Sequence, residues 1–173
     1  MRARQKDFLL HPGAAAEESS AVWTRLEALP AFRGASTVLF YMSMPGEPLT
    51  DGFAARWYGR KRLAVPLVVG ERLELREYDP LRLTVGYKGI REPAADTVVI
   101  LPRDVDLAVV PGVAFAPCAQ GAGFVRLGHG GGFYDRLLPE LSCPLVGVGY
   151  SFRLLDSLPE DPWDMRLDTV LLP

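Results

Sequence analysis

The sequence is poor in cysteine, because only Cys118 and Cys143 occur among its 173 residues. Two cysteines cannot build a disulfide framework, and their spacing fits no zinc-binding pattern. We therefore interpret both as ordinary buried or incidental thiols. A reducing, cytoplasmic setting is the simplest expectation for such a chain.

Long apolar runs and a large charge of one sign are also lacking. No apolar stretch is long enough to span a bilayer, and the basic N-terminal residues have no apolar core behind them, as a secretion signal would. The formal net charge of −2 provides no overall positive field for nucleic acid or an anionic membrane. We expect neither partner, so any anion must be bound by a local cluster of residues.

The apolar content is nevertheless ample for a packed core. A hydrophobic fraction of 49% and a length of 173 residues fit one domain of ordinary size, and no internal repeat or linker interrupts the chain. We therefore expect residues 1–173 to form a single domain, and we expect it to be a monomer.

Apolar runs of strand length alternate with amphipathic segments of helical period. Helices are expected over residues 14–29, 49–58 and 133–138, and strands over residues 37–42, 62–69, 72–78, 106–111, 144–150 and 169–172. Pro66 favours the end or the edge of its strand, and residues 80–93 are expected to be a loop with short turns. Because several strands are apolar on both faces, the pattern predicts an α/β domain with a mostly parallel sheet flanked by helices.

The most distinctive segment is Arg126 to Asp135, which holds four glycines within five positions. Glycines allow positive φ and a close approach of the backbone to a ligand. Their consecutive N–H groups can form an anion nest, and the helix expected after them adds the positive end of its dipole. With the strand at 106–111 upstream, we expect a glycine-rich phosphate loop between a strand and a helix, and Asp135 is placed to hold a metal beside it.

A plain connecting loop is the alternative, because the segment matches neither the P-loop nor the dinucleotide-binding pattern. Arg126 and Asp135 on its two sides favour an anion site, since a simple turn needs neither charge. Ligands of parallel sheets bind at the carboxyl ends of the strands. The loops that leave such ends are expected at residues 43–47, 112–132 and 151–164.

With its flanking segments, the glycine loop resembles a known family signature. Residues 110–115 (VPGVAF) and 126–135 (RLGHGGGFYD) resemble the signature of the 5-formyltetrahydrofolate cyclo-ligase family, and residues 41–50, 89–93 and 158–168 resemble further segments of that family in the same order. The resemblance implies an ATP- and Mg²⁺-dependent conversion of 5-formyltetrahydrofolate to 5,10-methenyltetrahydrofolate, with release of ADP and phosphate. It implies that the formyl oxygen is phosphorylated and that N10 of the folate then attacks the activated carbon, a chemistry that requires positioning and charge neutralisation.

The resemblance also assigns roles to individual residues. For ATP it implies contacts from Arg2, Arg4, Arg126, Leu127, Gly128, His129, Gly130, Gly131, Gly132, Phe133 and Tyr134, with Arg126 and Tyr134 also catalytic. For the folate it implies contacts from Tyr41, Met42, Glu47, His129, Gly132 and Phe133, with Tyr87 and Trp163 as candidate stacking aromatics. For Mg²⁺ it implies Asp135 and Asp164, which suits a hard cation that takes oxygen ligands.

Ordinary structural roles remain open for several of these residues. His129 and Glu47 could be solvated loop residues, Asp135 a charge on the side of a helix, and Asp164 a cap. The aromatic residues and Met42 could belong to the core, and Arg2 and Arg4 could lie on a frayed terminus.

Three departures from the family pattern leave room for other functions. The segment 116–125 is longer than in the family and lacks its aspartate, Trp163 stands where a histidine is common, and the N-terminal lysine has no match. An impaired family member that only binds folate or nucleotide is therefore one alternative. A different enzyme on a related α/β scaffold is another.

Overall fold

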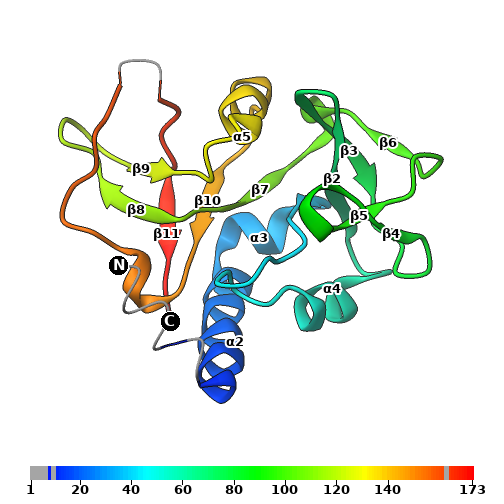
Figure 1. Ribbon diagram of the computed structural model, residues 1–173, viewed down its shortest axis with the longest axis horizontal. Helices are drawn as coiled ribbons and strands as arrows, with labels where there is room; N and C mark the ends of the chain where they lie inside the picture. The colour runs from blue at the N-terminus through cyan, green and yellow to red at the C-terminus, as the bar shows by residue number, and fades with distance from the viewer. Residues whose placement is uncertain (1–7, 9–10, 162–163) are drawn as a thin grey trace.

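The computed structural model describes residues 8, 11–161 and 164–173 (Figure 1). Its centre is a seven-stranded sheet with the order β11-β10-β7-β1-β2-β3-β6. The strands are β1 Thr37–Leu39, β2 Arg62–Val69, β3 Arg72–Glu77, β6 Val99–Ile100, β7 Leu107–Pro111, β10 Leu145–Val148 and β11 Thr169–Leu171. The neighbours from β11 to β2 pair in parallel, and β3 pairs antiparallel with both β2 and β6. The predicted α/β domain with a mostly parallel sheet is confirmed.

Helices cover both faces of this sheet. The helices α2 Pro12–Ala28, α3 Pro30–Gly34 and α4 Asp51–Trp57 pack on one face, and α5 Phe133–Leu137 with the 3₁₀ turn η3 Leu138–Glu140 packs on the other. Pro12 and Pro30 stand at the first turns of α2 and α3, where a missing backbone N–H is harmless. In the described part of the chain no helix combines the length and the apolarity that crossing a membrane requires.

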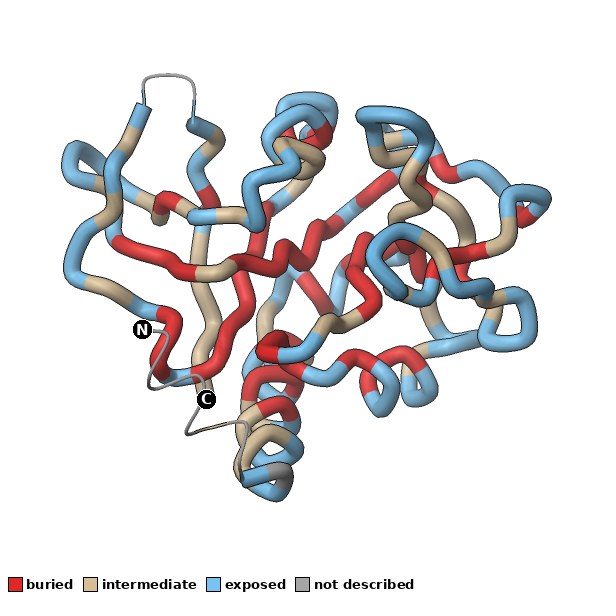
Figure 2. The backbone as a smooth tube through the Cα atoms, in the orientation of Figure 1, coloured by how far each residue is buried: buried red, intermediate tan, exposed pale blue. Residues whose placement is uncertain are grey.

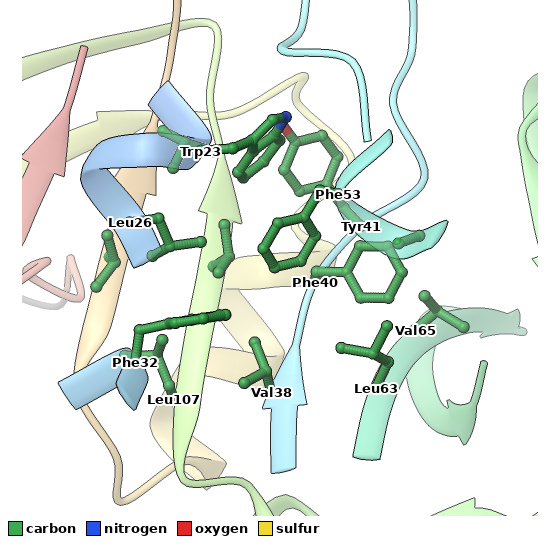
Figure 3. Packing of buried hydrophobic residues seen from close by; sticks show 14 of the residues in the cluster. Trp23, Leu26, Phe32, Val38, Phe40, Tyr41, Phe53, Leu63, Val65 and Leu107 are labelled. Atoms are coloured by element: carbon green, nitrogen blue, oxygen red, sulfur yellow. The ribbon is translucent and has the colours of Figure 1, made fainter. Parts of the chain in front are cut away.

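The core is divided between the two faces because side chains alternate along each strand. Val38, Leu63 and Leu107 face α2, α3 and α4, whereas Leu39 and Ala108 face α5. Figure 3 shows the first face, where Trp23, Leu26 and Phe32 meet Val38, Phe40 and Phe53. The inner strands are buried along most of their length (Figure 2), as the continuous apolar runs predicted.

Pro66 lies inside β2 rather than at its end. β1 pairs only with residues 62–64 of β2, so at Pro66 the strand has β3 as its one ladder partner among the strands that the structure describes. The missing N–H of proline is therefore tolerated on the open side of the strand, which agrees with the expectation of a local edge.

Two hairpins were not predicted. Residues 80–93, expected to be a loop, contain β4 Leu83–Val85, the 3₁₀ turn η1 Tyr87–Gly89 and β5 Arg91–Pro93. The segment after β7 forms a second hairpin from β8 Ala114–Pro117 and β9 Phe124–Leu127. The glycine loop lies between a strand and a helix as predicted, but the strand before it is β9 and not the strand at 106–111. All four strands were missed because they are short and lack a regular alternation of polar and apolar residues.

Candidate functional site

A cavity lies at the carboxyl ends of β1 and β7, where the sequence predicted a ligand site. It is bounded by the segment after β1, the apolar faces of β2 and β3, the tip of the β4–β5 hairpin and the glycine loop. Its lining residues are Tyr41, Met42, Met44, Glu47, Pro66, Val68, Leu73, Tyr87, Lys88, Ile90, Arg91, Glu92, Pro111, Arg126, Gly128, His129, Gly130, Gly131, Gly132, Phe133, Tyr134 and Asp135. Segments from four distant parts of the chain thus share one space.

Most of the candidate residues meet in this cavity. Of those that the structure describes, only Leu127 and Asp164 do not line it. Leu127 ends β9 opposite Ala114 and is half-exposed. Asp164 is exposed, and its Oδ2 atom accepts a hydrogen bond from the Asp161 amide at 2.9 Å. Arg2, Arg4 and Trp163 lie outside the described residues.

Arg126 is the buried cation of the site. Only 6% of its side chain is exposed, and its Nη2 atom lies 2.5 Å from Oδ1 of Asp135, whose own side chain is 68% exposed. The guanidinium also lies 5.4 Å from the ring centre of Tyr134. A Cβ atom on Gly128 would lie 2.7 Å from its Nη1 atom, so this glycine leaves room for the arginine. Charge, aromatic ring and glycine together hold one guanidinium against the loop.

The glycine loop has the backbone geometry that only glycine adopts without strain. Gly130 and Gly132 have φ of 83° and 67°, and the α5 helix begins directly after Gly132. The carbonyl of Gly131 accepts a hydrogen bond from the Nη2 atom of Arg136 at 2.8 Å. A Cβ atom on Gly130 would meet nothing within 4 Å, so its backbone is open to a ligand.

Tyr134 places a buried hydroxyl without a partner in the cavity wall. Its oxygen has no hydrogen-bond partner among the described residues. Burial, followed by the negative charge of Glu47, raises the pKa of Tyr134 well above the usual range, and Arg126 opposes this shift only in part. The hydroxyl therefore stays protonated and can donate a hydrogen bond to a ligand.

Glu47 and His129 connect the loop of residues 43–47, which follows β1, to the glycine loop. The side chain of Glu47 is only 4% exposed, which rules out the solvated loop residue that the sequence allowed. Its Oε2 atom accepts a hydrogen bond from the Met44 amide at 2.9 Å, and its Oε1 atom lies 3.2 Å from Nε2 of His129. His129 is half-exposed and therefore borders the cavity while it contacts a buried carboxylate.

Residues 46–49 are held by side chains from distant elements rather than by strand pairing. Their backbone groups bond to the Tyr41 hydroxyl, Ser19, the Trp23 indole and Arg153, at distances of 3.1, 2.9, 2.6 and 2.7 Å respectively. Tyr41 and Met42 are themselves buried at the end of β1, so they serve the core and the cavity together. The position of Glu47 is therefore set by a network that includes α2 and the C-terminal part of the chain.

Arg153 is the positioning residue that sequence reasoning missed. It ends the 3₁₀ turn η4 Ser151–Arg153 after β10, is 3% exposed, and donates to the carbonyls of Gly46 and Val113 at 2.7 and 2.8 Å. Burial lowers the pKa of Arg153, and the negative charge of Glu47 opposes this. The loop 151–164 was expected at the ligand site, and it contributes through this arginine although none of its described residues lines the cavity. An arginine just after a buried strand was the available signal.

Replacing Arg153 with methionine is expected to lower the free energy of unfolding by about 2 kcal/mol, because two buried carbonyls lose their donors. Urea unfolding followed by circular dichroism measures this change. Arg103→Met is the matched control, since the Arg103 side chain is 79% exposed and its loss should change little. Equal stability of the two variants would show that Arg153 does not hold the loops together.

Carboxylates in the cavity offer a partial metal site. No cluster of three His, Cys, Asp or Glu side chains that could hold a metal occurs in the described ranges. Mg²⁺, however, is commonly bound by one or two carboxylates together with substrate phosphates and water. The exposed carboxylate of Asp135, beside the glycine loop, fits that mode of binding.

Comparisons with known proteins agree with this architecture. The 5-formyltetrahydrofolate cyclo-ligase family model matches residues 2–173. The 5-formyltetrahydrofolate cyclo-ligase of Escherichia coli (strain K12) is 31% identical over 179 aligned residues, covering 98% of this chain and 96% of the relative. That of Haemophilus influenzae is 30% identical over 149 residues, covering 81% and 77%.

Solved structures show the same relationship. The 5,10-methenyltetrahydrofolate synthetase of Aquifex aeolicus superimposes with a TM-score of 0.80 at 33% identity, covering 98% of this chain and 88% of that one. The Mycoplasma pneumoniae synthetase shares the fold, with a TM-score of 0.70 at 23% identity over 99% and 97% of the two chains. The chain described here belongs to the 5-formyltetrahydrofolate cyclo-ligase family.

Proposed function

We propose that this chain converts 5-formyltetrahydrofolate to 5,10-methenyltetrahydrofolate with ATP and Mg²⁺, releasing ADP and phosphate. The observation that carries the proposal is that one cavity joins a glycine loop with a buried arginine to a buried glutamate. The glycine loop and the arginine suit an anion, and the buried glutamate suits the N–H edge of a heterocycle. A reaction between a nucleotide and a reduced folate needs both in the same space.

The residues around the glycine loop fit a triphosphate. Gly130 and Gly132 present their backbone with positive φ, and Arg126 supplies a charge-assisted donor. Bound ATP would supply the phosphoryl group that turns the formyl oxygen into a good leaving group. Arg126 would neutralise the charge on the transferred group, and the Tyr134 hydroxyl would donate to an oxygen beside it.

The metal assignment rests on Asp135 for the described part of the site. Its carboxylate pairs with Arg126, so each neutralises the other. With ligand present, Arg126 would turn to phosphate and Asp135 to Mg²⁺. Asp164 lies outside the cavity lining, so its service as a second ligand is a separate part of the proposal.

Glu47 is proposed to bind the pterin ring of the folate. A buried carboxylate can accept hydrogen bonds from the 2-amino group and from N3–H together. His129 contacts one oxygen of Glu47, so the ring would share or replace that contact. Tyr41, Met42, Phe133 and Tyr87 would form the apolar walls around it.

The test of the function is an absorbance assay for the methenyl product in the near ultraviolet. The full chain is mixed with 5-formyltetrahydrofolate, Mg²⁺ and ATP, and parallel samples omit ATP or contain a chelator. A rise in the methenyl absorbance that needs both ATP and Mg²⁺ supports the proposal. Folate binding by calorimetry without any rise would support an impaired, binding-only member, and the absence of both would contradict the whole assignment.

Replacing Gly128 with alanine is expected to lower kcat/KM for ATP by about 10- to 100-fold, because a displaced catalytic group can cost this much. The added methyl would lie 2.7 Å from the Nη1 atom of Arg126 and would push the guanidinium away. Gly13→Ala is the control, because a methyl there would meet nothing within 4 Å. Unchanged steady-state kinetics in Gly128→Ala would show that the placement of Arg126 does not limit turnover.

A further inference from the structure

Glu92 is a second buried carboxylate in the cavity, beside Glu47. It lies on β5, is 6% exposed and lines the cavity. Glu47, the other buried glutamate of the site, receives a hydrogen bond from the Met44 amide and contacts His129. The side chain of Glu92 has neither a hydrogen bond nor an ion pair with any residue that the structure describes, and only its backbone carbonyl accepts, from the Thr84 hydroxyl.

Gly86 explains how the carboxylate comes to lie there. A Cβ atom at Gly86 would lie 1.8 Å from Oε2 of Glu92 and 2.4 Å from its Cδ atom, so the glycine provides the space that the carboxylate occupies. The hairpin pairs Thr84 with Glu92 and so fixes the backbone of both strands. Packing therefore sets the position of the carboxylate, and no polar partner within the described chain does so.

The neighbouring cations do not neutralise this group. Arg91 forms an ion pair with Asp51, and Arg126 pairs with Asp135. Lys88, the third cation of the cavity lining, lies over the Tyr87 ring and forms no ion pair with Glu92, and the lining residues Pro66, Val68 and Leu73 offer no side-chain donors. The carboxylate oxygens of Glu92 are open to the cavity and not sealed in the core, so a molecule bound there can donate a hydrogen bond to them. The partner it lacks is a hydrogen-bond donor from a ligand.

We propose that Glu92 is a second substrate-binding carboxylate, which accepts a hydrogen bond from an N–H group of the bound reduced folate. This inference rests on the proposed function, because it takes its ligand from that reaction. An anion is the wrong occupant beside Glu92, whereas a tetrahydropterin carries N–H donors on more than one edge. Glu47 takes one edge, Glu92 takes a different N–H, and the phosphates lie toward Arg126.

The experiment compares Glu92→Ala and Glu92→Gln with the wild-type full chain. Steady-state assays give KM for 5-formyltetrahydrofolate and for ATP, and calorimetry gives the folate Kd without ATP. We expect Glu92→Ala to raise the folate KM and Kd by about 10- to 100-fold, as the loss of a hydrogen bond to a charged group does. The ATP KM should stay within about twofold, and Glu92→Gln, which keeps one acceptor oxygen, should lie between wild type and Glu92→Ala.

Thermal unfolding separates this role from a structural one. Because the Glu92 side chain forms no hydrogen bond or ion pair within the described ranges, Glu92→Gln should leave Tm unchanged or raise it, as expected when a group serves function at the expense of stability. Glu77→Gln is the matched control, because Glu77 lies on the adjacent β3 strand, pairs with Arg62 and does not line the cavity. This control should change neither folate constant.

Two results would overturn the inference while the cyclo-ligase function stands. One is an active wild-type enzyme whose folate KM and Kd are unchanged by Glu92→Ala. The other is a fall in Tm together with equal increases in KM for folate and for ATP, which would make Glu92 a structural residue. A wild-type chain that neither turns over nor binds 5-formyltetrahydrofolate would instead contradict the proposed function, and the role of Glu92 would fall with it.

Discussion

Replacing Arg126 with alanine is expected to reduce kcat/KM by about 10³-fold, which is the scale measured for an arginine that stabilises a phosphoryl transition state. The guanidinium is almost fully buried, so water cannot take over its charge. It also lies against Gly128 of the glycine loop and pairs with Asp135, and it is proposed to neutralise the charge on the transferred group. The methenyl absorbance assay with varied ATP and folate measures the effect. ATP binding should weaken more than folate binding.

Two further variants make this result specific. Arg126→Lys keeps the charge but loses the forked donor geometry, so it should recover only part of the activity. Arg136→Ala removes an arginine that follows the same loop but donates to the carbonyls of Glu71 and Gly131. It should cost far less than Arg126→Ala. If Arg126→Ala weakened folate binding more than ATP binding, Arg126 would lie beside the pterin and not beside the phosphates.

Replacing Asp135 with alanine is expected to abolish Mg²⁺-dependent turnover while the protein stays folded. The Asp135 side chain is 68% exposed, so its loss should leave the core intact. A metal that stabilises charge in the transition state contributes several kcal/mol, and its loss corresponds to about 100-fold or more in rate. Turnover measured across a Mg²⁺ titration tests this, with circular dichroism to verify the fold.

Asp135 could act through Mg²⁺ or through Arg126, because it also pairs with Arg126. If its role is to hold the metal, more Mg²⁺ should rescue Asp135→Asn in part. If its role is only to orient Arg126, added Mg²⁺ should change nothing. Asp164→Ala provides the comparison for the second predicted ligand. Near-normal activity of Asp135→Ala would show that the metal is held elsewhere.

The parallel part of the sheet could be predicted because each of its strands is a continuous apolar run. β7 and β10 are buried on both faces, and that burial leaves a pattern in the sequence. β4 and β5 leave none, since each has only three residues and much of the hairpin is exposed. Their pairing depends on a tertiary position over the cavity, which local residues do not encode.

The candidate site could be predicted where the residue types themselves indicate an unusual backbone or a bound charge. Clustered glycines and a flanking arginine predicted an anion site at residues 126–135, and most of these residues line the cavity. The burial of Glu47 was not predictable, because its neighbours Pro45 and Gly46 suggest an exposed turn. Arg153 escaped notice because its role depends on a carbonyl 107 positions away in the chain. Asp164 was placed by resemblance, and its metal role remains a prediction.

The network around residues 46–49 has a consequence for folding kinetics. The loop takes its donors from Ser19 and Trp23 near one end of the chain and from Arg153 near the other. Contacts of such sequence separation carry a large loop-closure entropy and form slowly. In the sheet, β7 lies between β1, which precedes the loop, and β10, which precedes Arg153. Refolding should therefore restore backbone structure first and ligand binding last, as a separate and slower phase.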